Sequence, residues 1–341
     1  MGSTDKGSSA WVTLATTDGY AVGALVLAHS LKAVNTRHKL HVLYTDGVSD
    51  EMTAQLFQVF DDHTKVNVLD SEDAENLALI NRPDLGVTFT KLHCWRLTQY
   101  SKCVFLDADT FVVKNCDELF ERPEFSAAPD VGWPDIFNTG VFVFVPSEQT
   151  YRNLLDFALV YGSFDGGDQG LLNAYFSTWR ESDATHRLPF TYNVTTVAIY
   201  GYAAALKRFA SNIKIIHFLG KQKPWAVLYG DGTAGMAFVS DYHKQWYQLY
   251  ANIVQQLLPP SSSVISSSTP SLPSSSFSVI QHPLTSFENR PIVSQGATAI
   301  PGRAPAAGGG YEAWEAGSPD YLGVDSFANI QKAIEKALKG E

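Results

Sequence analysis

Two aspartates stand two positions apart in the first half of the 341-residue chain. Asp107 and Asp109 follow the apolar run 103–106, which is typical of a buried strand. In an extended segment, side chains at this spacing point to the same side. Mn²⁺ and Mg²⁺ prefer such hard oxygen ligands and bridge them to a diphosphate. The pair predicts a divalent-metal site, while a solvated acidic turn is the alternative explanation.

A glycine-rich acidic loop at 164–170 is the second candidate. Asp165 and Asp168 stand on either side of a double glycine, and Gln169 follows just before a predicted helix. Glycines let the backbone approach a ligand closely. Helix capping would explain Asp168 or Gln169, but it does not explain two acids around two glycines. We expect this loop to contact a ligand.

A histidine and two lysines form the third candidate. His217 ends the predicted strand 213–216, and Gly220, Lys221 and Lys223 follow it. One histidine with two aspartates is a suitable ligand set for Mn²⁺, and the ammonium groups suit a diphosphate. A structural histidine beside a solvated lysine pair is the alternative.

A short polar turn is the fourth candidate. Asn138 and Thr139 precede the predicted strand 141–145. Their side chains both donate and accept hydrogen bonds, as sugar hydroxyls require. An ordinary turn uses the same residue types, so this pair is ambiguous by itself.

The elements that must position these residues alternate between strands and helices. Such alternation predicts an α/β fold with a mostly parallel sheet and helices on both faces. Ligands then bind beyond the carboxyl ends of the strands. Strands are predicted at 11–15, 39–44, 65–69, 103–106 and 141–145, and helices at 20–34, 50–60, 91–100 and 149–161.

Composition and missing motifs exclude several classes of function. The net charge is −10 without a basic cluster, which argues against nucleic acid as a partner. No apolar stretch reaches the about 20 residues of a membrane helix. The turn at 16–20 lacks a dinucleotide fingerprint, and no Walker-type loop occurs. Three cysteines, at 94, 103 and 116, favour a reducing compartment, and we expect a cytoplasmic protein in which the sequon 193–195 is inert.

The composition changes sharply near residue 258. We expect a folded domain over 1–258 and a disordered linker rich in Ser, Pro, Gly and Ala over 259–310. Residues 311–341 regain aromatic residues and a helical pattern, which predicts a short partner-binding motif. Its expected binding residues are Tyr321 and the apolar stripe Phe327, Ile330, Ile334 and Leu338.

The combined motifs resemble one enzyme family. The segments 85–95, 106–109, 138–142, 165–170 and 217–225 are similar to those of the retaining glycosyltransferases that include the glycogenins, galactinol synthases and bacterial galactosyltransferases. This resemblance covers about 10–255, and separately the final 25 or so residues. It implies a GT-A type, Rossmann-like domain and UDP-glucose as the donor substrate.

The resemblance also implies a role for each candidate residue. Asp107, Asp109 and His217 would bind Mn²⁺, and Ala108 would contact the donor between them. Lys91, Gly220 and Lys223 would hold or organise the diphosphate, with Lys91 and Asp168 counted as catalytic. Uridine and ribose would contact Leu14, Thr16, Thr17, Tyr20 and Arg82, and the glucose would contact Asn138, Thr139, Asp165, Asp168 and Gln169.

Glycogenin-like proteins glucosylate themselves, and Tyr200 matches the acceptor position. By residue type alone, Tyr200 and Tyr202 would be typical of one strand face. The resemblance further implies a homodimer and a C-terminal tail that binds glycogen synthase. It leaves open whether Asp168 attacks the sugar or only stabilises its positive charge. Two other hypotheses are a hexosyltransferase with a separate small acceptor, such as a polyol, and a non-catalytic adaptor.

Overall fold

The computed structural model describes residues 8–79, 83–196, 203–220, 222–226 and 237–257. A six-stranded sheet in the order β3-β2-β1-β4-β7-β6 forms its centre. The strands β1, β2, β3 and β4 pair in parallel, whereas β7 is antiparallel to both β4 and β6. The bounds are Ser9–Ala15 (β1), Lys39–Tyr44 (β2), Asp62–Lys65 (β3), Lys102–Leu106 (β4), Ser126–Pro129 (β6) and Phe137–Phe144 (β7).

A second, three-stranded sheet has the order β5-β9-β8. Its strands are Thr110–Val112 (β5), Val194–Thr195 (β8) and Ile215–His217 (β9). β5 begins four residues after β4 ends, so the small sheet starts at the carboxyl edge of the large one. In this way the fold brings residues near position 217 to the turn that follows β4.

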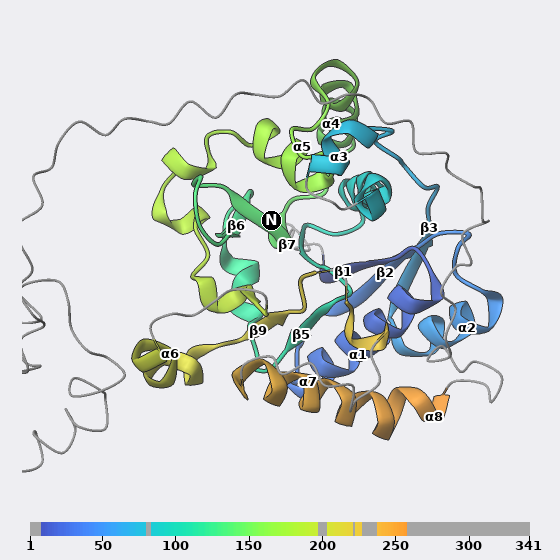
Figure 1. The fold of residues 1–341 in the computed structure, drawn as a ribbon. Coiled ribbons are helices and arrows are strands. Elements are labelled where there is room, and N and C mark those ends of the chain that lie inside the picture. The colour runs from blue at the N-terminus through green and yellow to red at the C-terminus, as the bar shows by residue number, and fades with distance from the viewer. Residues whose placement is uncertain (1–7, 80–82, 197–202, 221, 227–236, 258–341) are drawn as a thin grey trace, which may run out of the picture. The chain divides into compact units, whose positions relative to one another are not determined.

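Helices cover both faces of the large sheet (Figure 1). Buried residues of α1, α2 and α7 belong to one apolar cluster, and those of α4 and α5 belong to the other. Side chains of β4 alternate between them, with Val104 and Leu106 in the first cluster and Cys103 and Phe105 in the second. The helices are Asp18–Ala33 (α1), Asp50–Val59 (α2), Ala74–Leu79 (α3), Glu148–Tyr161 (α4), Asp168–Tyr175 (α5), Ala203–Phe209 (α6), Ala237–Leu249 (α7) and Gln255–Leu257 (α8).

Most predicted elements are present, but two differ. The strand expected at 65–69 lies at Asp62–Lys65 instead, because its pairing with β2 begins at Asp62. Beyond Val66 the chain leaves the sheet, and Leu69 hydrogen-bonds to Thr90. The helix expected at 91–100 is a series of 3-10 turns at Pro83–Arg96. Residues 89–95 are all buried, so tertiary contacts rather than one amphipathic face determine this segment.

Several expectations concern residues outside the described ranges. Tyr200, Arg82, the linker 259–310 and the tail 311–341, with its five expected binding residues, are among them. The boundary at 258 therefore stays a prediction. Within the described residues, no helix combines the length and the apolar character needed to cross a membrane.

A buried histidine makes the domain sensitive to acid. His41 on β2 is 1% exposed, and its ring nitrogens each lie 3.0 Å from a hydroxyl, of Tyr100 and of Thr64. Burial lowers the pKa of His41 to about 4. As the pH falls, the unfolded chain binds this proton near 6.5, before the folded chain does, so stability is lost between about 6.5 and 4.

We predict that His41→Gln removes this part of the acid sensitivity. The wild type should lose about 3 kcal/mol of unfolding free energy from this group between pH 6.5 and 4, and the variant should not. Urea unfolding followed by tryptophan fluorescence at several pH values measures the difference between the two slopes. Equal slopes for both proteins would show that His41 is not responsible.

Candidate active site

Asp107, Asp109 and His217 form one cluster of metal-ligand type. The two aspartates lie in the turn between β4 and β5, where Thr110 donates backbone and hydroxyl hydrogen bonds to the Asp107 carbonyl. His217 pairs with Thr110 across β5 and β9. Its Nε2 atom is 3.3 Å from Asp109 Oδ1 and 4.0 Å from Asp107 Oδ2. One ligand atom from each residue lies within 4.8 Å of the others, so this donor set fits a divalent cation.

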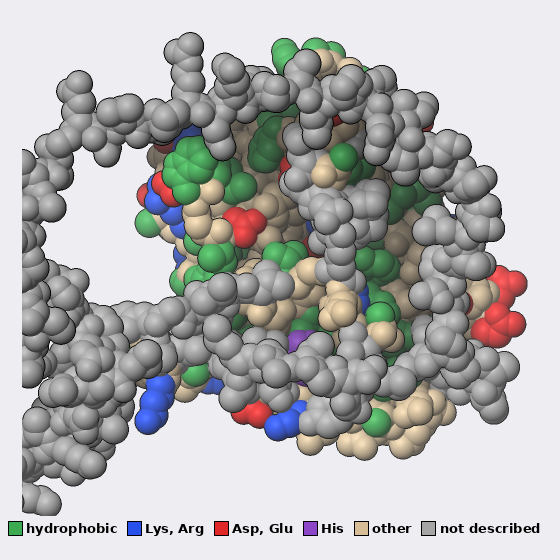
Figure 2. Space-filling model, viewed as in Figure 1, with side chains coloured by type: hydrophobic (Ala, Val, Ile, Leu, Met, Phe, Trp, Pro, Cys, Tyr) green, Lys and Arg blue, Asp and Glu red, His purple; other side chains and the backbone are tan. Residues whose placement is uncertain are grey.

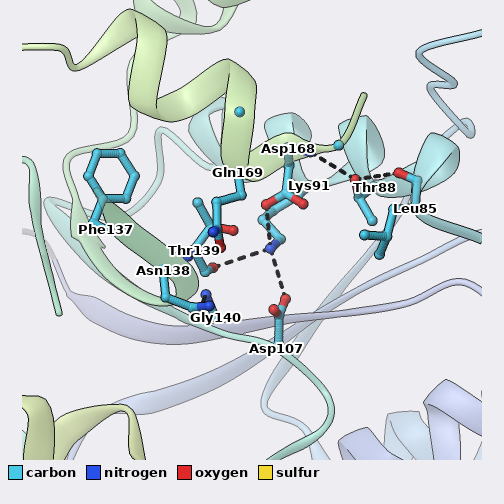
Figure 3. Close-up of polar contacts among 12 residues, drawn as sticks. Leu85, Thr88, Lys91, Asp107, Phe137, Asn138, Thr139, Gly140, Asp168 and Gln169 are labelled. Carbon is cyan, nitrogen blue, oxygen red and sulfur yellow. Dashed lines mark hydrogen bonds and ion pairs between the residues drawn. The ribbon is translucent and has the colours of Figure 1, made fainter. Parts of the chain in front are cut away.

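Lys91 connects this cluster to the glycine-rich loop (Figure 3). Its Nζ atom lies 2.9 Å from Asp107 Oδ1, 2.6 Å from Asp168 Oδ2 and 3.2 Å from the Thr139 carbonyl oxygen. An ammonium has three protons, so these three oxygens use all of them. Burial alone would lower the pKa of Lys91, but the two carboxylates raise it well above its usual value. Lys91 therefore stays charged and organises the acids around it.

The two acids of the glycine-rich loop, Asp165 and Asp168, make different contacts. Asp165 Oδ1 accepts hydrogen bonds from Ser163 Oγ and from the backbone of Gly167 and Gly170, at 2.8, 2.9 and 3.0 Å. Asp165 thus satisfies backbone groups at the start of α5, which the capping alternative assigned to Asp168 or Gln169. Asp168, the first residue of α5, instead directs its carboxylate at Lys91. Burial raises the pKa of Asp165.

Hydrogen bonds link three residues on one wall of the cavity through an aspartate that the sequence patterns do not indicate. The three residues are Asn138, Thr139 and Gln169. Asp130, just after β6, accepts hydrogen bonds from Gln169 Nε2 at 2.6 Å and Asn138 Nδ2 at 3.4 Å. Gln169 Oε1 accepts from the Thr139 backbone at 3.4 Å. No pattern along the chain indicates Asp130, because its role arises from the pairing of β6 with the strand that carries Asn138.

Lys223 approaches the cluster from a loop anchored on α1. Its ammonium forms a buried ion pair with Asp109. Two residues later, Trp225 packs against Tyr20 and against Gly19 and Gly23 of α1. A Cβ atom at Gly23 would lie 2.4 Å from the Trp225 ring, so only glycine lets the indole sit this close.

The two metal-cluster aspartates have opposite pKa shifts. Burial raises the pKa of Asp107. Lys91 acts in the opposite direction, and the negative charges of Asp109 and Asp168 add to the rise. The Asp107 side chain is 28% accessible, but this surface lines the cavity. Burial acts on Asp109 in the same direction, yet His217 and Lys223 hold its pKa well below the usual range. Two ammonium groups thus face three carboxylates, Asp107, Asp109 and Asp168, and this excess of negative charge favours a cation.

These residues surround one cavity of about 320 Å³. Thr17 is exposed on the surface, and neither it nor Gly220 lines the cavity. Leu85, Val87, Thr88 and Leu219 line it without having been predicted to bind a ligand. The predicted residues that do line it are Leu14, Thr16, Tyr20, Lys91, Asp107, Ala108, Asp109, Asn138, Thr139, Asp165, Asp168, Gln169, His217 and Lys223.

A family profile covers this whole arrangement. Residues 11–228 match the family described as Glycosyl transferase family 8. The chain belongs to glycosyl transferase family 8. Among solved structures, an active-site mutant of LgtC aligns with a TM-score of 0.50 and 19% identity, over 71% of this chain and 95% of that one. At this identity the alignment shows the fold, and it confirms the predicted GT-A type.

Curated relatives narrow the assignment within the family. Glycogenin-1 of Mus musculus is 46% identical, over 97% of this chain and 99% of its own length, and the Homo sapiens protein is 44% identical over the same shares. Glycogenin-1 of Caenorhabditis elegans is 58% identical over 71% of this chain and 55% of its own length. By this similarity the chain is a glycogenin-type retaining glucosyltransferase, a self-glucosylating primer of glycogen synthesis. The predicted enzyme class is confirmed.

We predict that Lys91→Met destabilises the protein by about 3–5 kcal/mol, because it leaves buried carboxylates without their partner. Lys214→Met is the matched control. Lys214 pairs with Glu118 at a site where the two side chains are 27% and 39% exposed, and losing such a pair costs at most about 1 kcal/mol. Chemical unfolding of the metal-free proteins compares the two variants. Similar small losses in both would contradict the central role of Lys91.

Proposed function

We propose that this enzyme transfers glucose from UDP-glucose to its own Tyr200 in a Mn²⁺-dependent reaction, and then extends a short α-1,4-glucan. One observation carries the proposal. The metal-ligand cluster and the Asp168 carboxylate face the same cavity and share the Lys91 ammonium. A sugar nucleotide has two parts that match these groups. Its diphosphate would be neutralised by a metal at the cluster, and its sugar carbon, which becomes cationic, would lie near the carboxylate.

The donor would lie across the cavity in a defined direction. Leu14, Thr16 and Tyr20 line it near the carboxyl end of β1, where the nucleotide would bind. The diphosphate would lie near Lys223 and the metal-ligand cluster. The glucose would contact the opposite wall, which comprises Asn138, Thr139, Asp165, Asp168 and Gln169. Thr17, Gly220 and Arg82 remain predicted contacts.

The chemistry needs charge stabilisation on both sides of the bond that breaks. A bound Mn²⁺ would supply Lewis acidity to the leaving diphosphate. Lys223, whose ammonium lies beside Asp109, would add a second positive charge on that side. Lys91 fixes the Asp168 carboxylate, which would stabilise the positive charge on the sugar or attack its anomeric carbon.

The route of the chain supports Tyr200 as the acceptor. β8 pairs with β9 beside the metal-ligand cluster, and the Thr196 amide donates to the His217 carbonyl at 3.0 Å. Tyr200 follows four residues later, and a fully extended backbone of four residues spans at most about 14 Å. A segment that starts at the metal site is well suited to carry an acceptor into it.

The remaining parts of the proposal concern partners. Glycogenin relatives imply an interaction with glycogen synthase, and we propose that the tail 311–341 provides it through Tyr321, Phe327 and the apolar stripe. A tethered motif would raise the local concentration of the synthase around the growing glucan. We also propose a cytoplasmic homodimer, in which one subunit's Tyr200 can reach the other's site.

The metal assignment predicts that Asp107→Asn and Asp109→Asn each slow self-glucosylation by at least about 10²–10³-fold, the effect of losing one preorganised stabiliser. Excess EDTA should have a similar effect on the wild type, and Mn²⁺ should restore it. Asp46→Asn, at a side chain 80% exposed, is the control. Hexose gain followed by intact-mass spectrometry is the measurement, and a full rate in either variant would refute the assignment.

The acceptor assignment predicts that Tyr200→Phe abolishes hexose gain on the protein. Hydrolysis of UDP-glucose, or transfer to an added maltoside, should stay measurable because the cavity residues are unchanged. Tyr202→Phe is the matched control and should gain hexose normally. If Tyr200→Phe still gains hexose, the acceptor lies elsewhere. If the wild type gains none but glucosylates a polyol, the enzyme uses a separate acceptor.

A further inference from the structure

Asn193 is a buried amide with no role in the site described so far. It directly precedes β8 and is 1% exposed, so its sequon is inaccessible to glycosylation in the folded protein. Its Oδ1 atom lies 2.9 Å from His217 Nδ1, and its Nδ2 atom donates to Asn138 Oδ1 at 2.8 Å. Asn193 therefore contacts His217 of the metal-ligand cluster on one side. On the other side it contacts Asn138, which belongs to the wall that we propose contacts the glucose (the sugar wall).

Only one orientation of these amides satisfies every partner. The backbone N–H of Gly140 can only donate, and it lies 2.9 Å from Asn138 Oδ1. The Asn138 Nδ2 group then faces the Asp130 carboxylate, which can only accept. Because Asn138 Oδ1 is an acceptor, Asn193 must present its NH₂ group to it. The Asn193 oxygen consequently faces His217, and the proton of a neutral His217 must be on Nδ1.

Packing fixes the histidine ring in the same place. A Cβ atom at Gly140 would lie 2.3 Å from His217 Cε1 and 2.5 Å from Nδ1, so the ring rests directly on the β7 backbone. The β7 backbone therefore blocks movement of the imidazole away from Asn193 on this side. Its Nε2 atom, which carries the lone pair in this tautomer, faces Asp107 and Asp109.

We propose that Asn193 is a positioning residue that holds His217 in the Nδ1–H tautomer and thereby directs the Nε2 lone pair at the cation. The chain Asp130–Asn138–Asn193–His217 also ties the sugar wall to the metal-ligand cluster. Such outer contacts commonly set the orientation of a metal-binding histidine. The inference rests on the proposed Mn²⁺ site only for the identity of the cation.

The first test measures Mn²⁺ binding to the full chain by electron paramagnetic resonance of free Mn²⁺. Asn193→Leu, which is similar in size but lacks the oxygen, should bind Mn²⁺ about 10–100-fold more weakly. Asn193→Asp keeps an oxygen opposite Nδ1 but replaces the NH₂ group that donates to Asn138 Oδ1 by a second oxygen, so it should recover part of the affinity. Asn173→Leu is the control, because it removes partly buried hydrogen bonds to Phe137 of β7 and to the Gln169 carbonyl of α5 without touching His217. Unchanged affinity in folded Asn193→Leu would overturn the proposal.

The second test needs neither metal nor activity. Nitrogen-15 NMR of the metal-free wild type in alkaline buffer should show the Nδ1–H tautomer for His217, assigned by the loss of its signals in His217→Gln. Asn193→Leu should lose this preference, and Asn193→Asp should retain it. An Nε2–H tautomer in the wild type would refute the inference even if the leucine variant fails to fold. If the wild type binds no Mn²⁺ but shows Nδ1–H, the metal assignment fails and the positioning role stands.

Discussion

The ammonium group of Lys91 is the interaction on which the rest of the site depends. It lies within ion-pair distance of Asp107 and Asp168, and without it these acids would share a buried space without a counter-charge. Replacing Lys91 and both acids together by apolar residues of similar volume would leave the fold as stable or make it more stable. The buried charge is therefore retained for the geometry that it imposes, since one cation sets the spacing between the metal-ligand cluster and the sugar-facing acid.

The fold brings these groups together by ending several elements at one edge of the sheet. β4 delivers two aspartates in a turn, and β7 enters from the same edge in the opposite direction. The small sheet then uses β5 and β9 to return His217 to that turn. Lys91 comes from the 3-10 segment packed on one face of the sheet. The site therefore depends on the relative placement of two sheets and one 3-10 segment, and buried residues of the two apolar clusters fix that placement.

The site residues that could be predicted from the sequence are those that a local pattern indicates. The aspartate pair, the double-glycine loop and His217 were found because each follows an apolar strand or precedes a helix. Asp130 and Asn193 were missed because their roles arise only when β6, β7 and β8 meet in space. The strand at Asp62–Lys65 was placed too late because its register depends on β2. Patterns along the chain therefore identify ligands better than the residues that orient them.

The charge balance of the cavity also constrains how a donor can bind. On the face in Figure 2, the Lys and Arg side chains of the described residues are scattered and do not form one patch. Inside the cavity both ammonium groups are already paired with carboxylates. A diphosphate entering without a cation would meet acids whose charge is only partly compensated. A divalent cation reverses that balance, so metal and nucleotide each supply the charge that the other needs, and the cavity accepts them together more readily than either alone.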